Sequence, residues 1–262
     1  MTAVDTTALP AAAAPGSGSA TAGAALRLDG VRLGRVGSPV LNRVDLDVRA
    51  GEVLAVVGPS GCGKSTLLRT LAGLLPPLAG TVTQDGTPVT RPAADRALVF
   101  QDDALLPWRT ARANVELPLA IRGTPRAERR RTAEAWLARV GLADHAHKLP
   151  HHLSGGQRQR VQLARALAGR PRAVLMDEPF AALDVQTRAG MQDLLVDVLA
   201  GTGATVVFVT HDVDEALYLG DRVALLDTGR GVRVLDVPAP RDRTATDRAD
   251  RTALRQRIVD SL

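Results

Sequence analysis

The residues best suited to chemistry lie in a glycine-rich segment near residue 60. The segment fits the pattern GxxxxGK[ST], in which glycines let backbone N–H groups turn inward around phosphate oxygens. Lys64 can reach the outer phosphates, the Ser65 hydroxyl can coordinate Mg²⁺, and Thr66 can help to hold the α-phosphate. The segment therefore predicts a loop that binds a nucleoside triphosphate, made of Gly58, Pro59, Ser60, Gly61, Cys62, Gly63, Lys64, Ser65 and Thr66.

Two adjacent carboxylates follow an apolar run further along the chain. Asp177 and Glu178 come directly after Ala173–Met176, and ligands bind at the carboxyl ends of strands in open α/β sheets. A hard carboxylate such as that of Asp177 suits Mg²⁺, usually through water. Exposed surface charges are the alternative, but the apolar residues before the pair and Pro179 after it favour a site. The pair therefore predicts metal binding and acid–base chemistry beside the phosphate-binding loop.

A mostly parallel sheet is expected to position these groups. The short apolar run Val53–Val57 precedes the phosphate-binding loop as a buried strand, and Lys64–Leu74 follows as a helix that Pro76 ends. Strands and helices then alternate, which is typical of an α/β fold with helices on the faces of the sheet. The expected strands are Ala97–Phe100, Ala173–Met176, Thr205–Val209 and Arg222–Leu226, and the expected helices are Val185–Leu199 and Asp212–Leu219.

An antiparallel part is predicted near the start of the chain. Leu26–Leu33 and Val44–Val48 alternate apolar and polar residues, as half-buried strands do. The segment Thr81–Val89 carries Asp85-Gly86 at its middle, which is a hairpin signal. The predicted fold class is therefore α/β, with a mostly parallel core and an additional antiparallel β part.

A helical block interrupts the strands between about residues 102 and 170. Apolar residues recur at helical spacing over Arg126–Val140, and Trp136 lies in that stripe, so we expect Trp136 in the core rather than at a ligand. A second helix begins at Ser154, because Gln157 stands three residues further on in the capping-box arrangement. The block should form a separate, inserted subdomain.

Composition limits the classes of protein that this chain can represent. Of its 262 residues, 45% are hydrophobic and 2% aromatic, so aliphatic side chains must fill the core. No run approaches the ~18 apolar residues of a membrane span. Cys62 is the one cysteine, which excludes an internal disulfide and a cysteine-based zinc site. The net charge is +5, but the sequence shows neither a basic stripe nor the interleaved aromatic residues that are typical of nucleic-acid binding. Nucleic-acid binding is therefore disfavoured.

Three regions are predicted along the chain. Residues 1–24 read as a disordered Ala/Thr/Gly-rich tail without a signal-peptide pattern, which favours a cytosolic protein. Residues 25–238 should form the nucleotide-binding domain. Residues 239–262 read as a charged tail with a helix over Thr252–Leu262.

The string Leu153–Gln157, with Arg158 to Arg160 after it, decides between the branches of P-loop proteins. It resembles the signature of the ATP-binding cassette (ABC) ATPases, and the resemblance covers roughly residues 26–237. A plain helix cap is the alternative reading of Ser154. In that family the signature closes over the ATP held by a second copy of the chain. The resemblance therefore implies a P-loop ATPase fold, ATP and Mg²⁺ as ligands, an ATP-bridged homodimer, and contacts to ATP from Ser154, Gly155, Gly156 and Gln157.

The resemblance also implies roles for single residues. Glu178 would be the general base for the attacking water. Gln101 would approach Mg²⁺ or that water and serve as a hinge for the helical subdomain. His211 would contact the γ-phosphate. Asp184 closes Ala181–Asp184, a loop that would lie along the partner subunit.

One position departs from the family pattern. Family members stack the adenine on an aromatic side chain shortly before Val40, and here Arg35 stands at that place. A guanidinium plane can stack on a base, so Arg35 is the expected adenine contact. Histidines 145, 147, 151 and 152 crowd the segment before the signature. A metal site is the alternative for these histidines, but their spacing favours solvated or packing roles.

The segment Leu105–Trp108 carries apolar side chains that would be exposed and would mark a partner surface. By resemblance it receives the membrane permease, and an extracytoplasmic solute-binding protein acts indirectly. The protein would then work at the cytoplasmic face of the membrane. The chain looks most like the nitrate/sulfonate/taurine importers, so aliphatic sulfonates are the first expectation for the solute. Taurine, nitrate, another solute or an exporter role remain alternatives.

Overall fold

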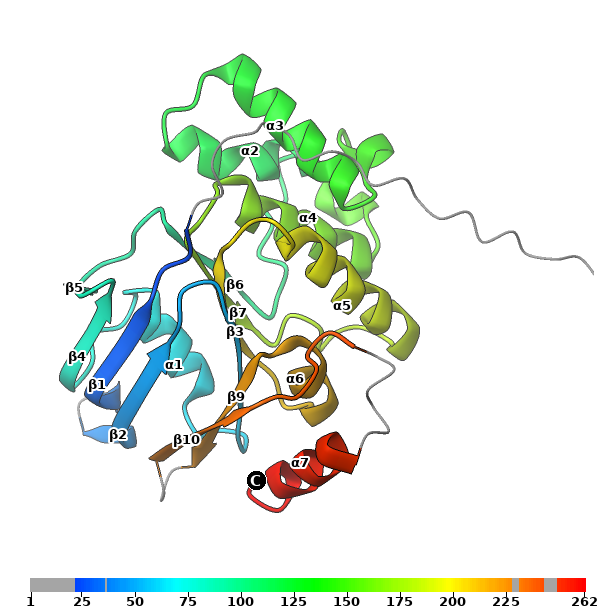
Figure 1. Ribbon diagram of the computed structural model, residues 1–262. Coiled ribbons are helices and arrows are strands. Elements are labelled where there is room, and N and C mark those ends of the chain that lie inside the picture. Colours follow the sequence, from blue (N-terminus) through cyan, green and yellow to red (C-terminus); the bar gives the residue numbers. More distant parts are fainter. Residues whose placement is uncertain (1–21, 36, 228–230, 243–248) are drawn as a thin grey trace, which may run out of the picture.

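A six-stranded sheet forms the centre of the fold, in the order β10-β9-β3-β8-β7-β6 (Figure 1). The structure is a computed structural model that describes residues 22–35, 37–227, 231–242 and 249–262. The paired strands from β9 to β6 are parallel, and β10 joins the edge antiparallel to β9. The strands are β3 (Val53–Val57), β6 (Arg96–Val99), β7 (Ala173–Asp177), β8 (Thr205–Val209), β9 (Arg222–Asp227) and β10 (Gly231–Asp236).

A four-stranded antiparallel sheet lies beside the central sheet, in the order β2-β1-β4-β5. Both residues of the turn before β5, Asp85 and Gly86, have positive φ angles of 49° and 79°, which is the geometry of a tight hairpin turn. The predicted hairpin is therefore confirmed. The strands are β1 (Leu26–Arg35), β2 (Ser38–Val48), β4 (Ala79–Gln84) and β5 (Thr87–Pro88).

Two hydrophobic layers enclose the central sheet. Leu67, Leu68 and Leu71 of helix α1 (Lys64–Leu71) share one layer with the antiparallel sheet and with Leu54 of β3. The layer on the other face contains apolar residues from the remaining helices of the domain. Figure 1 labels the helices that follow β7 along the chain. These are α5 (Val185–Leu199), α6 (Val213–Leu219) and α7 (Ala249–Val259).

The inserted helical block lies at one end of the sheet (Figure 1). Its helices are α2 (Ala111–Ile121), α3 (Arg126–Arg139) and α4 (Gly155–Ala168), with short 3-10 turns at Ala143–His145 and Pro150–His152. Trp136 is buried in the core, as predicted.

Some predicted bounds were wrong, and one α-helix and one strand were not predicted at all. The helix expected over Lys64–Leu74 ends at Leu71, because Gly73 adopts a φ of +77° and a Cβ there would lie 2.4 Å from the carbonyl oxygen of Arg91. The strand expected over Ala97–Phe100 covers β6, one residue earlier, and the helix expected over Thr252–Leu262 covers α7, three residues earlier. The α-helix and the strand without a prediction are α2 and β10.

The predicted tail over residues 1–24 lies almost entirely outside the described residues. Within the described part of the chain, no helix is long and apolar enough to cross a bilayer.

Candidate active site

The phosphate-binding loop joins β3 to α1. Gly58 sits where no side chain fits, since a Cβ would lie 2.6 Å from the carbonyl oxygen of Leu226. Gly61 and Gly63 have φ angles of +79° and +103°, which favour glycine. Lys64 begins α1, is buried, and donates hydrogen bonds from Nζ to the carbonyls of Gly58 and Pro59 at 2.8 and 2.9 Å. The loop therefore curls around the ammonium group of Lys64, beside the positive N-terminal end of helix α1.

Ser65 and Asp177 connect this loop to the end of β7. The Ser65 hydroxyl donates a hydrogen bond to Oδ1 of Asp177 at 3.0 Å. Burial raises the pKa of the Asp177 carboxyl and the charge of Glu178 raises it further, while the Ser65 hydrogen bond lowers it. A hydroxyl and a carboxylate that converge next to a phosphate-binding loop fit Mg²⁺, which prefers such hard oxygen ligands.

Glu178 and His211 form a second pair at the same sheet edge. Nδ1 of His211 lies 3.3 Å from Oε2 of Glu178. The two residues follow the neighbouring strands β7 and β8, and the Glu178 amide donates to the carbonyl of Val209 at 3.0 Å. Glu178 has a positive φ of 45°, so the backbone turns directly after Asp177. The two adjacent carboxylates therefore have different surroundings.

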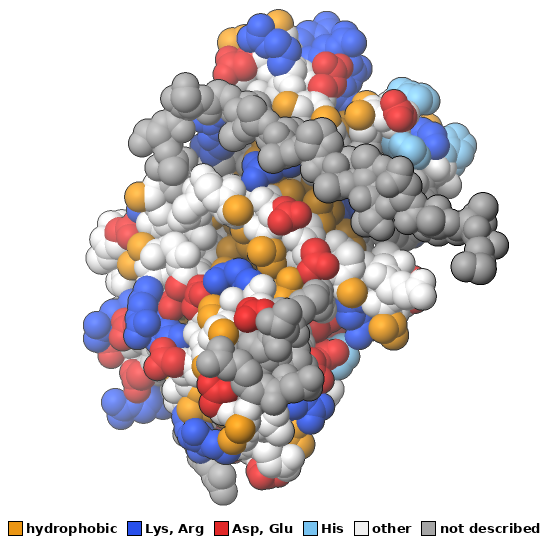
Figure 2. All heavy atoms as spheres, turned by 45° about the vertical axis from the view of Figure 1, so that its right-hand side comes forward, with side chains coloured by type: hydrophobic (Ala, Val, Ile, Leu, Met, Phe, Trp, Pro, Cys, Tyr) orange, Lys and Arg blue, Asp and Glu red, His pale blue; other side chains and the backbone are white. Residues whose placement is uncertain are grey.

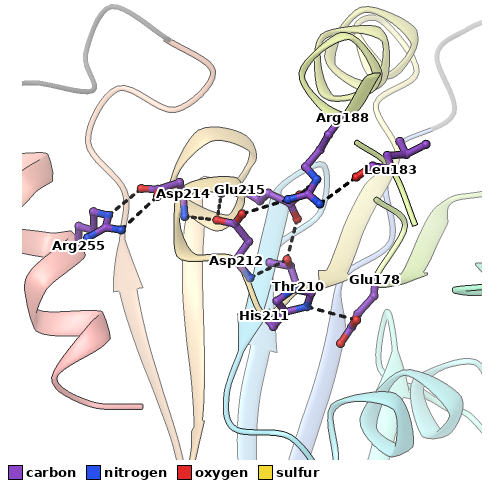
Figure 3. A network of polar contacts seen from close by, with 9 residues as sticks. All are labelled: Glu178, Leu183, Arg188, Thr210, His211, Asp212, Asp214, Glu215 and Arg255. Atoms are coloured by element: carbon purple, nitrogen blue, oxygen red, sulfur yellow. Dashed lines mark hydrogen bonds and ion pairs between the residues drawn. The ribbon is translucent and has the colours of Figure 1, made fainter. Parts of the chain in front are cut away.

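A polar network connects the residues next to His211 with helix α5 (Figure 3). The Thr210 hydroxyl donates to Oε2 of Glu215 at 2.7 Å, and burial raises the pKa of that Glu215 carboxyl. Arg188, from α5, lies 3.6 Å from a carboxylate oxygen of Asp212 and 3.6 Å from one of Glu215. Sequence reasoning missed this network, since none of its members stands in a recognisable motif.

The same arginine reaches back to the Ala181–Asp184 loop. Nη2 of Arg188 donates to the carbonyl of Leu183 at 3.0 Å. Asp184 caps α5, and its carboxylate accepts hydrogen bonds from the Thr187 amide and hydroxyl at 3.0 and 2.7 Å, which lowers its pKa. Asp184 therefore has a structural role as a helix cap, and its place along a partner subunit stays a prediction.

The signature segment forms the start of α4. Ser154 is the N-cap, and both hydrogen bonds of the predicted capping box to Gln157 are present, at 3.0 and 3.3 Å. Ser154 and Gly155 are exposed, and Gly156 is half-buried. Among the described residues, no hydrogen bond joins this segment to the phosphate-binding loop. One chain thus gathers Lys64, Ser65, Asp177, Glu178 and His211, and leaves the signature facing outward.

Arg35 and Gln101 are exposed. Arg35 ends β1, opposite Ser38 in the β1–β2 hairpin. The hairpin reaches the phosphate-binding loop, because a Cβ on Gly63 would lie 3.0 Å from the Val40 side chain. An adenine contact from Arg35 stays a prediction.

The predicted partner surface needs one correction. Leu105 is only 7% exposed and belongs to the core, whereas Trp108 is 73% exposed. Leu105 is buried as a member of the large hydrophobic cluster that joins the helical block to the central sheet. Leu106 is half-buried, so the exposed apolar surface of this segment is mainly that of Trp108.

Two groups of potentially reactive side chains lie outside the pair of carboxylates. The histidines before the signature gather at the surface of the helical block, where Figure 2 shows them in pale blue. Among the described residues, no group of His, Cys, Asp and Glu is arranged to hold a metal. Cys62 is buried, and that burial raises the pKa of its thiol, which lowers its reactivity.

Comparisons with known proteins agree with this geometry. Residues 41–181 match the family described as ABC transporter. The taurine import ATP-binding protein of Chromobacterium violaceum is 51% identical over 213 residues, which are 80% of this chain and 82% of that protein. The aliphatic sulfonates import ATP-binding protein of Agrobacterium fabrum is 46% identical over 243 residues, 93% of this chain and 91% of that protein.

A solved structure of a dimeric ATP-binding cassette in a post-hydrolysis state, bound to ADP and Pi, is also similar. It superposes with a TM-score of 0.71 at 35% identity and covers 82% of this chain and 99% of that one. The likeness agrees with the predicted α/β P-loop fold. The chain belongs to the ABC transporter family.

Proposed function

We propose that this chain is the ATP-hydrolysing subunit of an ABC importer for a small organic anion. The observation that carries the proposal is the convergence of the Ser65–Asp177 and Glu178–His211 pairs beside Lys64. Together, at one edge of the sheet, these groups supply a cation that binds phosphate, hard oxygen ligands for a metal and a carboxylate that can act as a base. The relatives named above, which import taurine or aliphatic sulfonates, support the class of solute.

Each residue then has a task in ATP hydrolysis. The phosphate-binding loop and Lys64 hold the β- and γ-phosphates. Ser65 and Asp177, with Gln101, would hold Mg²⁺, which neutralises charge on the phosphate oxygens. Glu178 accepts the proton of the attacking water.

His211 lies beside that base and would contact the γ-phosphate. Since Nδ1 faces Glu178, Nε2 remains for the phosphate. Arg35 would stack on the adenine.

The site requires a second copy of the chain. Ser154 and the N–H groups at the start of α4 form an exposed anion-binding helix end, and it would complete the pocket of the partner. The dimeric state of the similar cassette supports this arrangement. The membrane permease would dock around Trp108, which places the protein at the cytoplasmic face of the membrane.

The experiment that tests this function is ATP turnover at increasing protein concentration. Specific activity should rise with concentration as dimers form. Full specific activity in a chain that stays monomeric at every concentration would contradict the proposal. The solute is tested separately, by measuring which sulfonates raise the melting temperature of the co-transcribed binding protein. An exporter role predicts that no such binding protein is encoded nearby.

A further inference from the structure

Gln162 of α4 holds the backbone on both sides of Gln101. Its Nε2 donates hydrogen bonds to the carbonyl oxygens of Phe100 and Asp102, at 2.9 and 3.0 Å. A primary amide has two N–H groups, so these two carbonyls match its full donor capacity. The Gln162 residue is 3% exposed. Because a buried amide without partners is costly, this contact fixes the segment at the end of β6.

Two arginines on the same face of α4 extend this contact. Arg158 donates from Nε to the Asp103 carboxylate at 2.6 Å. Arg165 donates to the carbonyls of Asp103 and Ala104 at 3.2 and 2.8 Å. Residues 158, 162 and 165 are spaced by four and three positions, which places them on one face of a helix. Residues 100–104 are therefore attached to α4, the helix that begins with the signature.

Ala104 shows that the attachment constrains the backbone. It has a φ of +45° without being glycine, a conformation that L-residues adopt only when the surroundings impose it. The contact of Arg165 with its carbonyl lies at this point.

We infer that Gln162 is a positioning residue for Gln101, because it attaches the backbone on both sides of Gln101 to the signature helix. The inference rests on the proposed function, in which Gln101 approaches Mg²⁺ or the attacking water. It deepens that function, because Trp108 and the permease surface follow the same segment a few residues later. A displacement at that surface would reach Gln101 and the signature together.

The experiment compares Gln162→Met with Gln159→Met as a matched control. Gln159 lies on the same helix, is 8% exposed, and makes no hydrogen bond to residues 100–104 within the described part of the chain. Methionine keeps the length of the side chain and removes the amide. Gln162→Met should lower kcat about tenfold, the effect expected from two lost hydrogen bonds, and raise the Mg²⁺ concentration that gives half-maximal activity. Gln159→Met should change neither.

A double-mutant cycle separates positioning from packing. In a Gln101→Ala background, Gln162→Met should cost little more, because the residue that it positions is gone. An equal loss in both backgrounds, or equal behaviour of Gln162→Met and Gln159→Met, would overturn the inference. If Gln101→Ala alone keeps full activity, the proposed role of Gln101 fails, and the positioning role fails with it.

A second variant and measured melting temperatures test whether a loss of activity comes only from unfolding. Gln162→Glu keeps the size and shape of the side chain and replaces the donor group by an oxygen, which the two carbonyls would repel. Melting temperature is measured for every variant, and kcat is compared at a temperature where each is folded. Gln162→Glu should repeat the loss of kcat and the shift in Mg²⁺ dependence, and an unchanged Mg²⁺ dependence would count against the inference.

Discussion

Oε2 of Glu178 lies 3.3 Å from Nδ1 of His211. The two residues stand at the ends of adjacent parallel strands, β7 and β8, so the pairing follows from the sheet itself. The carboxylate can orient the imidazole, and the imidazole can hold the carboxylate toward a water molecule. In the proposed function, the base and the residue that contacts the γ-phosphate are therefore neighbours, joined by this contact.

Replacing Glu178 by Gln should abolish hydrolysis while leaving ATP binding intact. The amide keeps the shape of the side chain but cannot accept a proton from water, and removal of a general base costs about 10²–10⁴-fold. ATP should then trap the dimer, which gel filtration with light scattering will detect. Glu134→Gln, at an exposed ion pair with Arg130, is the control and should hydrolyse normally. Unimpaired turnover by Glu178→Gln would refute its assignment as the base.

Replacing Asp177 by Asn should abolish Mg²⁺-dependent turnover and change how stability depends on pH. The native pKa of Asp177 is raised, chiefly by burial, so the folded state binds more protons than the unfolded one above about pH 4. The free energy of unfolding of the natural protein therefore loses this contribution as pH rises. Asn does not titrate, so the stability of the variant relative to the natural protein should increase as pH rises above about 4.

Asp184→Asn is the matched comparison with the opposite sign. Hydrogen bonds from Thr187 lower the pKa of Asp184, so its contribution to stability is present above the unfolded pKa and lost as pH falls. The Asn variant should therefore become less stable relative to the natural protein as pH rises. Urea unfolding of the nucleotide-free chain at several pH values measures both differences. If the difference in unfolding free energy from the natural protein follows pH in the same way for both variants, burial does not raise the pKa of Asp177.

The bounds of some regular elements could be predicted from the sequence to the residue, and those of others only to within a few residues. The bounds of α5 and β8 are as predicted, because each is bounded by a cap or a turn and buries an unambiguous pattern. The capping box at Ser154 was equally readable, since it depends on residues three positions apart. Helix α2 was not predicted, because Pro118 lies inside it and argues against a helix in isolation.

Contacts between distant segments could not be predicted. Gln162 binds backbone carbonyls about sixty positions earlier in the chain, and a carbonyl carries no sequence signal. Leu105 was expected on the surface, but it is buried in the hydrophobic cluster shared by the helical block and the central sheet. The proximity of Glu178 and His211 could be predicted because parallel strands bring their carboxyl ends to one edge. Its support by Arg188 depends on how α5 packs, which local patterns do not encode.

Replacing Arg35 by Ala should weaken ATP binding several-fold and leave the melting temperature unchanged. Arg35 is exposed at the end of β1, so its removal disturbs no core contact, and a guanidinium that stacks on adenine contributes to affinity. Equilibrium binding of a fluorescent ATP analogue measures the change. Arg27→Ala, at an exposed position of the same strand, serves as the control. An unchanged affinity for the nucleotide would remove Arg35 from the site.

Replacing Arg188 by Met should lower kcat about tenfold with little change in the KM for ATP. The guanidinium donates to the Leu183 carbonyl and faces the carboxylates of Asp212 and Glu215 (Figure 3). It therefore ties the Ala181–Asp184 loop to Asp212 and Glu215, which follow His211 in the chain. A loss confined to kcat indicates misplaced catalytic groups, because removal of a residue that binds ATP would raise KM.

Arg188→Lys and Arg139→Met complete this test. Lysine keeps the charge but lacks the planar fork that reaches a carbonyl and two carboxylates at once, so its kcat should lie between those of the natural protein and Arg188→Met. Arg139 also donates to carbonyls of the α5 region, those of Asp197 and Ala200, but at the other end of that helix. Its replacement by Met should leave kcat unchanged. If both Met variants lose activity in proportion to their melting temperatures, Arg188 stabilises α5 and does not position His211.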